Sequence, residues 1–447
     1  MRVIKNFKQF WRNEWLWLIP AVAAVLVCYY RFPELHNDDH PEIIRYIAET
    51  GRRPAVEQFR SAQHMLYYHT AAAVLYRFLD RSEPVLGIAP DRAGQLLNLA
   101  CWLGLTALLV PILRLLVKDF WARVFSLLVF GASTRWMTMA VTIDNDTMMA
   151  FFATLALLLT IRMIRRSEMP SWCSILLIAF IIGIAGAIKH NGQQFIIPFI
   201  GCLLSRRWLY RERMKALLGR TAVSLLIVLT ITAPFYLRHR RDTGQWIYHD
   251  QGFHQDNWSG DRWEFFTFRF GEILRRPYIP YRDVTDVRLC PADLSWPSKI
   301  YMNWWSLPDF LPDRPPPGPT AAIFLSGLPL TFLFLIGLVL AAQSFRKEPG
   351  WLVPLGWFGV VIFFMAAASV LFPEPRWGCH TYPRHVLGAV GGIIPLFGLA
   401  FERVAARWPR AKFLLYLILA VHLLIFWNLL LSGPFYSLQT PWPKYPM

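Results

Sequence analysis

Charged residues are scarce in this chain. Only 17% of its 447 residues are Asp, Glu, Lys or Arg, whereas 55% are hydrophobic. A soluble protein of this length and composition would expose too much apolar surface, so that class is excluded. Aromatic residues are abundant instead, with 20 Trp and 33 Phe. The composition therefore indicates a polytopic membrane protein.

Acidic residues are fewer than basic ones, with 29 Asp and Glu against 46 Lys and Arg, for a net charge of +17. Such a surplus can indicate nucleic-acid binding, but here the basic residues cluster in short loops between apolar runs. This distribution follows the positive-inside rule, so we exclude a nucleic-acid partner and expect these loops and the N-terminus to be cytoplasmic. The clusters lie at 2–12, 114–123, 162–166, 206–220, 346–347 and 403–412.

A cleavage site is also lacking after the first apolar run, so we expect that run to remain as an uncleaved anchor in the inner membrane. About 20 apolar residues suffice to cross a bilayer. The sequence predicts an all-α polytopic protein with about eleven transmembrane helices. They lie at 15–30, 96–117, 120–141, 147–164, 172–189, 193–204, 221–236, 321–342, 351–371, 386–401 and 413–431.

Three parts follow along the chain. Residues 1–237 form a transmembrane module that includes a first external loop, 31–95, in which the apolar segment 65–79 is expected to lie at the membrane interface. Residues 238–320 form an external loop rich in aromatic residues and Pro, and 321–447 hold the C-terminal transmembrane helices. Aromatic residues in the long loop suit a membrane-interface belt or the stacking of a sugar.

Two adjacent carboxylates, Asp38 and Asp39, follow the first span directly, and His40 comes next. Carboxylates at a bilayer edge are costly unless solvated or paired, and they are usually functional. Apolar residues then recur at helical spacing between Ile43 and Ala48. This pattern predicts a short helix that lies on the membrane surface and holds an acidic site at the water boundary.

Further ionisable and aromatic residues fall on the same external face under this topology. A carboxylate there can act as a general base, and Lys or Arg can hold a phosphate. The set suits a lipid-phosphate donor that enters from the bilayer. Besides the acidic pair and His40, it comprises His64, Tyr67, Tyr68, Asp144, Asn145, Asp146, Lys189, Arg384 and His385.

Metal ligands of the oxygen and imidazole type are present in this set, so a divalent ion is possible, but we expect no metal or other cofactor to be required. Cys290 and Cys379 are the two cysteines in the expected external loops. An oxidising compartment allows them to pair.

These residues resemble the motifs of the GT-C integral-membrane glycosyltransferases, and among them the bacterial relatives of dolichyl-phosphate-mannose–protein mannosyltransferases and of the aminoarabinose transferase. The matching elements are the acidic pair, QHMLYY at 63–68, Asn145-Asp146, the turn 189–192 and Pro383-Arg384-His385. The chain departs from the family where Asp-Asp replaces Asp-Glu and where Met65 replaces Pro-Pro.

The resemblance implies an inverting transfer of a sugar from a polyprenyl-phosphate donor to an acceptor hydroxyl, on the external (periplasmic) face of the membrane, as part of the chemistry of the cell envelope. Asp39 or Asp38 would be the base, and Lys189 and Arg384 would bind the donor phosphate. The acceptor could be a lipid, a glycan or a protein. A transporter or lipid flippase is the alternative, and a non-catalytic sugar-binding relative is a third, although no internal repeat supports a transporter.

Overall fold

The computed structural model describes residues 13–31, 39–55, 58–59, 62, 66–244, 246, 267–268, 270–271, 296–305, 317–371 and 383–432. All secondary-structure elements of three or more residues in these ranges are helices. In chain order these are η1 (Glu14–Leu18), α2 (Ile19–Arg31), α3 (His40–Thr50), α4 (Tyr67–Leu86), η3 (Pro90–Arg92), α5 (Ala93–Leu116), α6 (Phe120–Gly131), α7 (Thr134–Met139), α8 (Asp146–Arg165), α9 (Trp172–Ile188), η4 (His190–Phe195), α10 (Ile196–Tyr210), α11 (Met214–Thr243), α14 (Trp296–Trp305), α15 (Pro317–Ser344), η7 (Pro349–Trp351), α16 (Leu352–Leu371), η8 (Pro383–Ala389), α17 (Val390–Arg407) and α18 (Pro409–Ser432).

Eight helical segments in the described part of the chain are long and apolar enough to cross a membrane, and α6 and α9 are shorter apolar helices. The prediction of an all-α, multi-pass membrane protein is therefore confirmed. The eight segments are Glu14–Arg31, Pro90–Leu116, Asp146–Arg165, Met214–Thr243, Ala321–Ser344, Pro349–Ala367, Val386–Arg407 and Pro409–Leu431.

Three predicted spans have different limits in the structure. The expected span 120–141 is divided into α6 and α7, because the backbone of Ser133 has an extended conformation that interrupts the helix. The span 193–204 begins as the 3-10 helix η4 and continues as α10 to Tyr210. The span 221–236 belongs to α11, which runs on to Thr243 and ends at Gly244, whose φ of 75° is left-handed. Helices commonly end at a residue in the left-handed conformation, and this residue is usually glycine because glycine adopts that conformation without strain.

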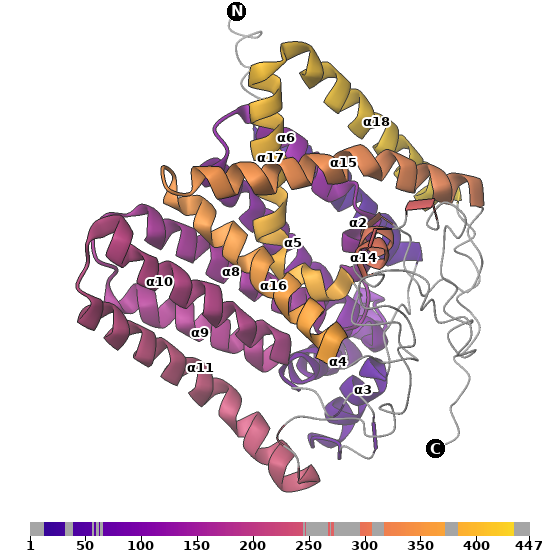
Figure 1. Cartoon of the computed structure of the whole chain (residues 1–447). Coiled ribbons are helices and arrows are strands. Elements are labelled where there is room, and N and C mark those ends of the chain that lie inside the picture. The colour runs from indigo at the N-terminus through magenta and orange to yellow at the C-terminus, as the bar shows by residue number, and fades with distance from the viewer. Residues whose placement is uncertain are drawn as a thin grey trace, which may run out of the picture.

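The helices form two neighbouring groups (Figure 1). α9 packs between α8 and α11, with α10 beside them, whereas α17 packs against α15, α16 and α18 and also touches α5 and α6. All of the residues from Val390 to Phe401 in α17 are buried, so this helix forms much of the core. α3 and α4 pack on each other, and α4 joins them to α5.

The basic loops meet at one end of this bundle. There, the Arg165 guanidinium donates to the carbonyl oxygen of Leu115, and Tyr210 donates from its hydroxyl to the carbonyl of Ile164 at 2.7 Å. Lys118 pairs with Glu348 at 2.6 Å, which brings the 346–348 loop to the same place. The described basic loops at 114–123, 162–166, 206–220 and 346–347 therefore lie at one end, whereas the cluster at 2–12 lies outside the described residues and the cytoplasmic side of the loops stays a prediction.

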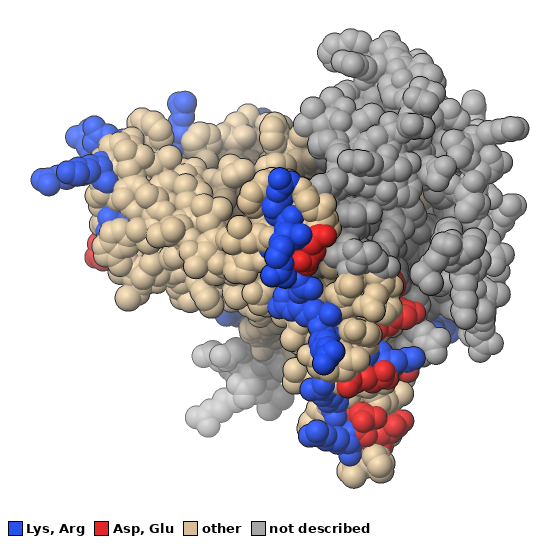
Figure 2. Space-filling view, turned by 90° about the horizontal axis from the view of Figure 1, so that it is seen from below, with Lys and Arg blue, Asp and Glu red and all other residues tan. Residues whose placement is uncertain are grey.

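The opposite end carries α3, α4 and the end of α11. Viewed from below, it bears a row of Lys and Arg side chains with Asp and Glu beside them (Figure 2). Arg45 pairs with Asp91 at 2.8 Å, and Arg238 and Arg241 both pair with Asp242, at 3.0 and 3.2 Å. Exposed pairs of this kind contribute little to stability, so this surface is a mixed and solvated one.

Candidate functional site

The short helix that the sequence predicts after the acidic pair exists as α3, and it begins immediately after Asp39, whereas its position on the membrane surface stays a prediction. Asp39 is the N-cap residue, and its carbonyl oxygen accepts a hydrogen bond from the amide of Ile43 at 3.1 Å. The apolar face of α3 is buried while Glu42, Arg45 and Glu49 are exposed, as the sequence pattern predicts. Asp38 lies outside the described residues, as does His64.

His40 points into the protein and meets a second histidine, His69 of α4. The two rings are stacked, with centroids 4.9 Å apart, and His40 Nδ1 lies 2.6 Å from His69 Nε2. Burial lowers the pKa of His69 to about 3, so its imidazole is neutral at ordinary pH. Nδ1 of His69 is buried with no hydrogen-bond partner among the described residues. Sequence reasoning missed His69, since only the packing of α4 on α3 brings it to His40.

Tyr68, which precedes His69 in α4, connects α4 to α5. Its buried hydroxyl donates to the carbonyl oxygen of Gly94 at 3.2 Å. A Cβ at Gly94 would press on Tyr68, on Ile44 of α3 and on Ile143, so glycine is what allows these elements to meet. Burial, with the nearby Asp144 carboxylate, raises the pKa of Tyr68 well above its usual value. The phenol is therefore a neutral donor. Tyr67 is 44% exposed and is not brought to this cluster.

The turn before α8 is held by side chains on both sides. Asn98 of α5 donates from Nδ2 to the carbonyl oxygens of Thr142 and Asp144, at 2.5 and 2.8 Å. The Asp144 carboxylate accepts from the amide of Asp146 at 2.8 Å. Asp144, Asn145 and Asp146 are all buried, which fixes the position of the first residue of α8.

Lys189 and Asp146 form a buried ion pair at this turn. Lys189 Nζ donates to Asp146 Oδ1 at 2.6 Å, with side-chain exposures of 10% and 1%. Asp146 Oδ2 is buried without a hydrogen-bond partner in the described part of the chain. Asn145 donates from Nδ2 to the carbonyl of Ile188 at 3.4 Å, so two residues of the turn contact the end of α9.

The chain turns sharply after Lys189, and Gly192 makes this possible. The amide of Gly192 donates to the Lys189 carbonyl at 2.7 Å. A Cβ at Gly192 would overlap the backbone carbonyl group of Ala185, one turn before Lys189. The Lys-x-x-Gly spacing seen in the sequence therefore has a structural cause, because only glycine permits this close approach.

The late segment with Arg384 and His385 forms the backbone of η8. Gly388 of η8 packs on Phe195 of η4 and on Met149, which is less than one helical turn from Asp146 along α8. This places η8 against α8, which supplies Asp146, and against η4, which begins directly after Lys189. The side chains of Arg384 and His385 lie outside the described residues, as do Cys290 and Cys379.

Within the described ranges, no group of three or more His, Cys, Asp or Glu side chains is arranged to hold a metal ion. The expectation that no cofactor is required stays a prediction. What the cluster does offer is a stacked histidine pair beside the Asp39 backbone in which His69 is neutral, a neutral phenol at Tyr68, and a lysine whose carboxylate partner has one oxygen without a hydrogen bond among the described residues.

Solved structures similar to this chain include ArnT from Cupriavidus metallidurans bound to undecaprenyl phosphate, at 15% identity, with 88% of this chain and 78% of that chain covered and a TM-score of 0.39. Arabinofuranosyltransferase AftD from mycobacteria matches at 14% identity, with 94% and 27% covered and a TM-score of 0.45. Archaeal oligosaccharyltransferase AglB from Archaeoglobus fulgidus, in complex with an inhibitory peptide and a dolichol-phosphate, matches at 13% identity, with 96% and 55% covered and a TM-score of 0.47.

No protein-family model and no curated protein matches the chain. Two of the matched structures are named as an arabinofuranosyltransferase and an oligosaccharyltransferase. At these identities and TM-scores the likeness concerns the fold alone.

Proposed function

We propose that this protein is an inverting membrane glycosyltransferase that moves a sugar from a polyprenyl-phosphate donor to an acceptor hydroxyl. The observation that carries the proposal is the buried Lys189–Asp146 pair, which lies at the end of the bundle that also holds α3 and Asp39. The ion pair and Asp39 are connected through His40, His69 and Tyr68 and through the turn before α8.

Asp39, or Asp38 beside it, would take the proton of the acceptor hydroxyl. The acceptor oxygen then forms a bond to the anomeric carbon from the face opposite the donor phosphate, and the bond from that carbon to the phosphate oxygen breaks. The polyprenyl phosphate leaves with the electron pair, and the anomeric configuration inverts. A carboxylate is a suitable base for this step when it is placed within hydrogen-bond reach of the hydroxyl.

Lys189 and Arg384 would stabilise the charge that develops on the leaving phosphate. Asp146 holds the Lys189 ammonium in one position before the donor arrives, at 2.6 Å. A cation fixed in this way stabilises the transition state without first having to reorganise. His40, Asn145 and Tyr68 are then positioning residues, since their side chains hold the helices and turn that carry these groups.

The proposed site faces the outside of the inner membrane, opposite the basic loops, with the N-terminus inside. This orientation is supported by the gathering of those loops at the other end of the bundle. The donor, the acceptor (a lipid, a glycan or a protein) and membrane lipids are then the partners, and no metal is required.

The test is an assay of the purified, reconstituted protein with a panel of polyprenyl-phosphate sugars. The wild type should release polyprenyl phosphate and form an inverted glycoside with one of them. Asp39→Asn should abolish transfer and leave donor binding nearly unchanged, because only the proton acceptor is lost. Asp38→Asn should do so instead if the neighbouring carboxylate is the base. Full activity in both single variants and in the double variant would exclude the acidic pair as the base.

A further inference from the structure

An apolar groove lies at the surface of the bundle between α5 and the continuous helical segment formed by η1 and α2. Its volume is about 400 Å³. The exposed side chains of Ile19, Leu26 and Leu103 form its rim, while Leu18 and Thr106 are buried in its floor. Trp15, Val22, Ala23 and Ala107 complete the lining.

The groove exists because two small residues, Ala23 and Ala107, line it where the helices would otherwise present larger side chains. An opening of this kind, elongated and lined by carbon, fits a hydrocarbon chain of the surrounding bilayer. Shape alone would accept the tail of any lipid, so selectivity must come from what lies at the end of the groove.

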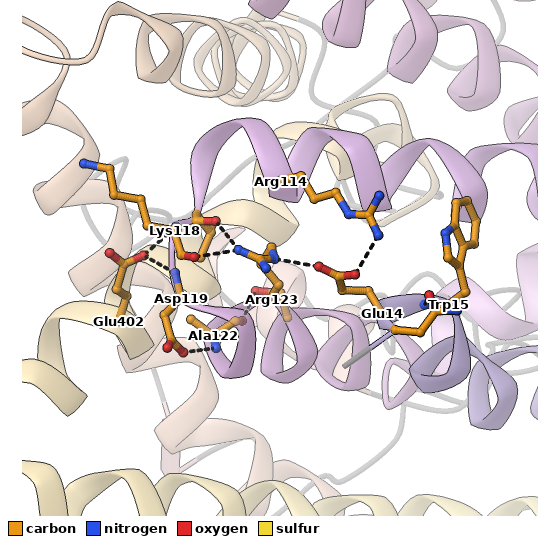
Figure 3. Close-up of polar contacts among 11 residues, drawn as sticks. Glu14, Trp15, Arg114, Lys118, Asp119, Ala122, Arg123 and Glu402 are labelled. Carbon is orange, nitrogen blue, oxygen red and sulfur yellow. Dashed lines mark hydrogen bonds and ion pairs between the residues drawn. The ribbon is translucent and has the colours of Figure 1, made fainter. Parts of the chain in front are cut away.

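That end carries a guanidinium. Arg114 is seven residues after Ala107 and eleven after Leu103, which places all three on one face of α5, with Arg114 about 10 Å further along the helix axis. The Arg114 side chain is 50% exposed, and its Nη2 donates a hydrogen bond to Glu14 Oε2 at 2.7 Å. Trp15 of the groove stands beside this pair, and the other terminal nitrogen of Arg114 points away from Glu14 (Figure 3).

The charge around Glu14 does not cancel. Arg123 also donates to Glu14, at 2.9 Å, and its remaining bonds go to the carbonyl oxygens of Val117 and Lys118. Two guanidinium groups therefore face one carboxylate, and the group of three keeps one positive charge. Because Glu14 is only 5% exposed and Arg123 only 16%, that charge is available to a ligand at Arg114.

From this geometry we propose that the α2–α5 groove binds one anionic glycerophospholipid, with an acyl chain between the helices and the headgroup phosphate on Arg114. Trp15, amphipathic and 44% exposed, lies where the acyl chain meets the headgroup. Aromatic side chains favour that depth of a bilayer. This site is at the end of the bundle with the basic loops, away from Asp39 and Lys189, and the proposal is independent of the glycosyltransferase function.

Quenching of Trp15 by brominated lipid tests the site. The protein is reconstituted in phosphatidylcholine vesicles that contain either brominated phosphatidylglycerol or brominated phosphatidylcholine, and the Trp15 signal is the wild-type emission minus that of Trp15→Phe, since the chain holds 20 Trp. Half-maximal quenching should be reached at a roughly five-fold lower fraction of brominated phosphatidylglycerol than of brominated phosphatidylcholine, because one cation beside an anionic headgroup strengthens binding by about this factor.

Three variants separate headgroup from chain. Arg114→Gln should remove the preference for the anionic lipid, whereas Arg114→Lys should keep it. Ala107→Phe, which fills the groove and leaves the Glu14 pair in place, should weaken quenching by both lipids. The matched control is Arg407→Gln, an exposed cation that does not line the groove, and it should change nothing.

Equal quenching of Trp15 by the two lipids in the wild type would overturn the proposal. An unchanged preference in Arg114→Gln would do so as well. If that variant does not fold, loss of the preference in Arg114→Lys, or undiminished quenching in Ala107→Phe, would be equally decisive against the site.

Discussion

The Lys189 ammonium lies 2.6 Å from Asp146 Oδ1, and this pair fastens the end of α9 to the start of α8 inside the protein. The two residues are 43 positions apart in the chain. In the sequence they are two separate candidates, one for phosphate binding and one at a helix start, whereas in the structure each is the partner of the other.

Removal of either member of this pair should be costly, because it leaves a buried charge without a partner. Lys189→Met and Asp146→Asn should each destabilise the protein by about 3–5 kcal/mol, and the double variant by less than either alone. Unfolding of the purified protein in one detergent measures this. Arg241→Gln, which breaks an exposed pair with Asp242, is the control and should cost about 0–1 kcal/mol. Single variants as stable as this control would show that the pair does not hold α8 to α9.

Acidification should destabilise the protein through His69. Burial lowers the pKa of His69 from 6.5 to about 3, so the folded state binds this proton less readily than the unfolded state does. The stability from keeping His69 neutral is thus fully present above pH ~6.5 and is lost as the pH falls toward 3, by up to about 1.4 kcal/mol per pH unit.

The His69→Gln variant should flatten this pH dependence, because its side chain can still hydrogen-bond His40 but does not titrate. His190→Gln, at an exposed position, is the control and should keep the wild-type slope. Unfolding measured between pH 7 and pH 4 makes the comparison. The same slope of stability against pH in wild type and His69→Gln would count against a neutral, buried imidazole at His69.

A methyl group at Gly192 should disturb the turn that carries Lys189. Gly192→Ala brings Cβ into the backbone carbonyl of Ala185, so it should destabilise the protein by about 1–3 kcal/mol and lower transfer activity. Gly201→Ala is the matched control. Among the described residues, no atom beyond the local backbone of α10 lies within 4 Å of the position of its Cβ, so this variant should cause no loss and should gain up to about 1 kcal/mol from better helix propensity. Similar behaviour of the two variants in unfolding and transfer assays would refute the tight-turn argument.

Local pattern was sufficient for much of the fold. Apolar runs near 20 residues predict the membrane helices, because the bilayer sets their length. The 3.6-residue period of Ile43, Ile44 and Ile47 predicts α3, because a helix puts these side chains on one face. Clusters of Lys and Arg predict which loops share an end of the bundle, since each loop with an excess of these residues tends to stay on the same side of the membrane.

The contacts between distant residues were decided only by the tertiary structure. Nothing in the spacing of His40 and His69, or of Asp146 and Lys189, indicates that they meet, because each contact depends on how two helices pack. The burial of Glu14 between Arg114 and Arg123 also depends on how distant helices pack, and so does the groove beside this group. The sequence by itself therefore determined the class of protein, the helices and the end of the bundle where acidic and basic candidates lie. The partners of those candidates followed from side-chain packing across the chain, which a one-dimensional pattern of hydrophobicity and charge does not contain.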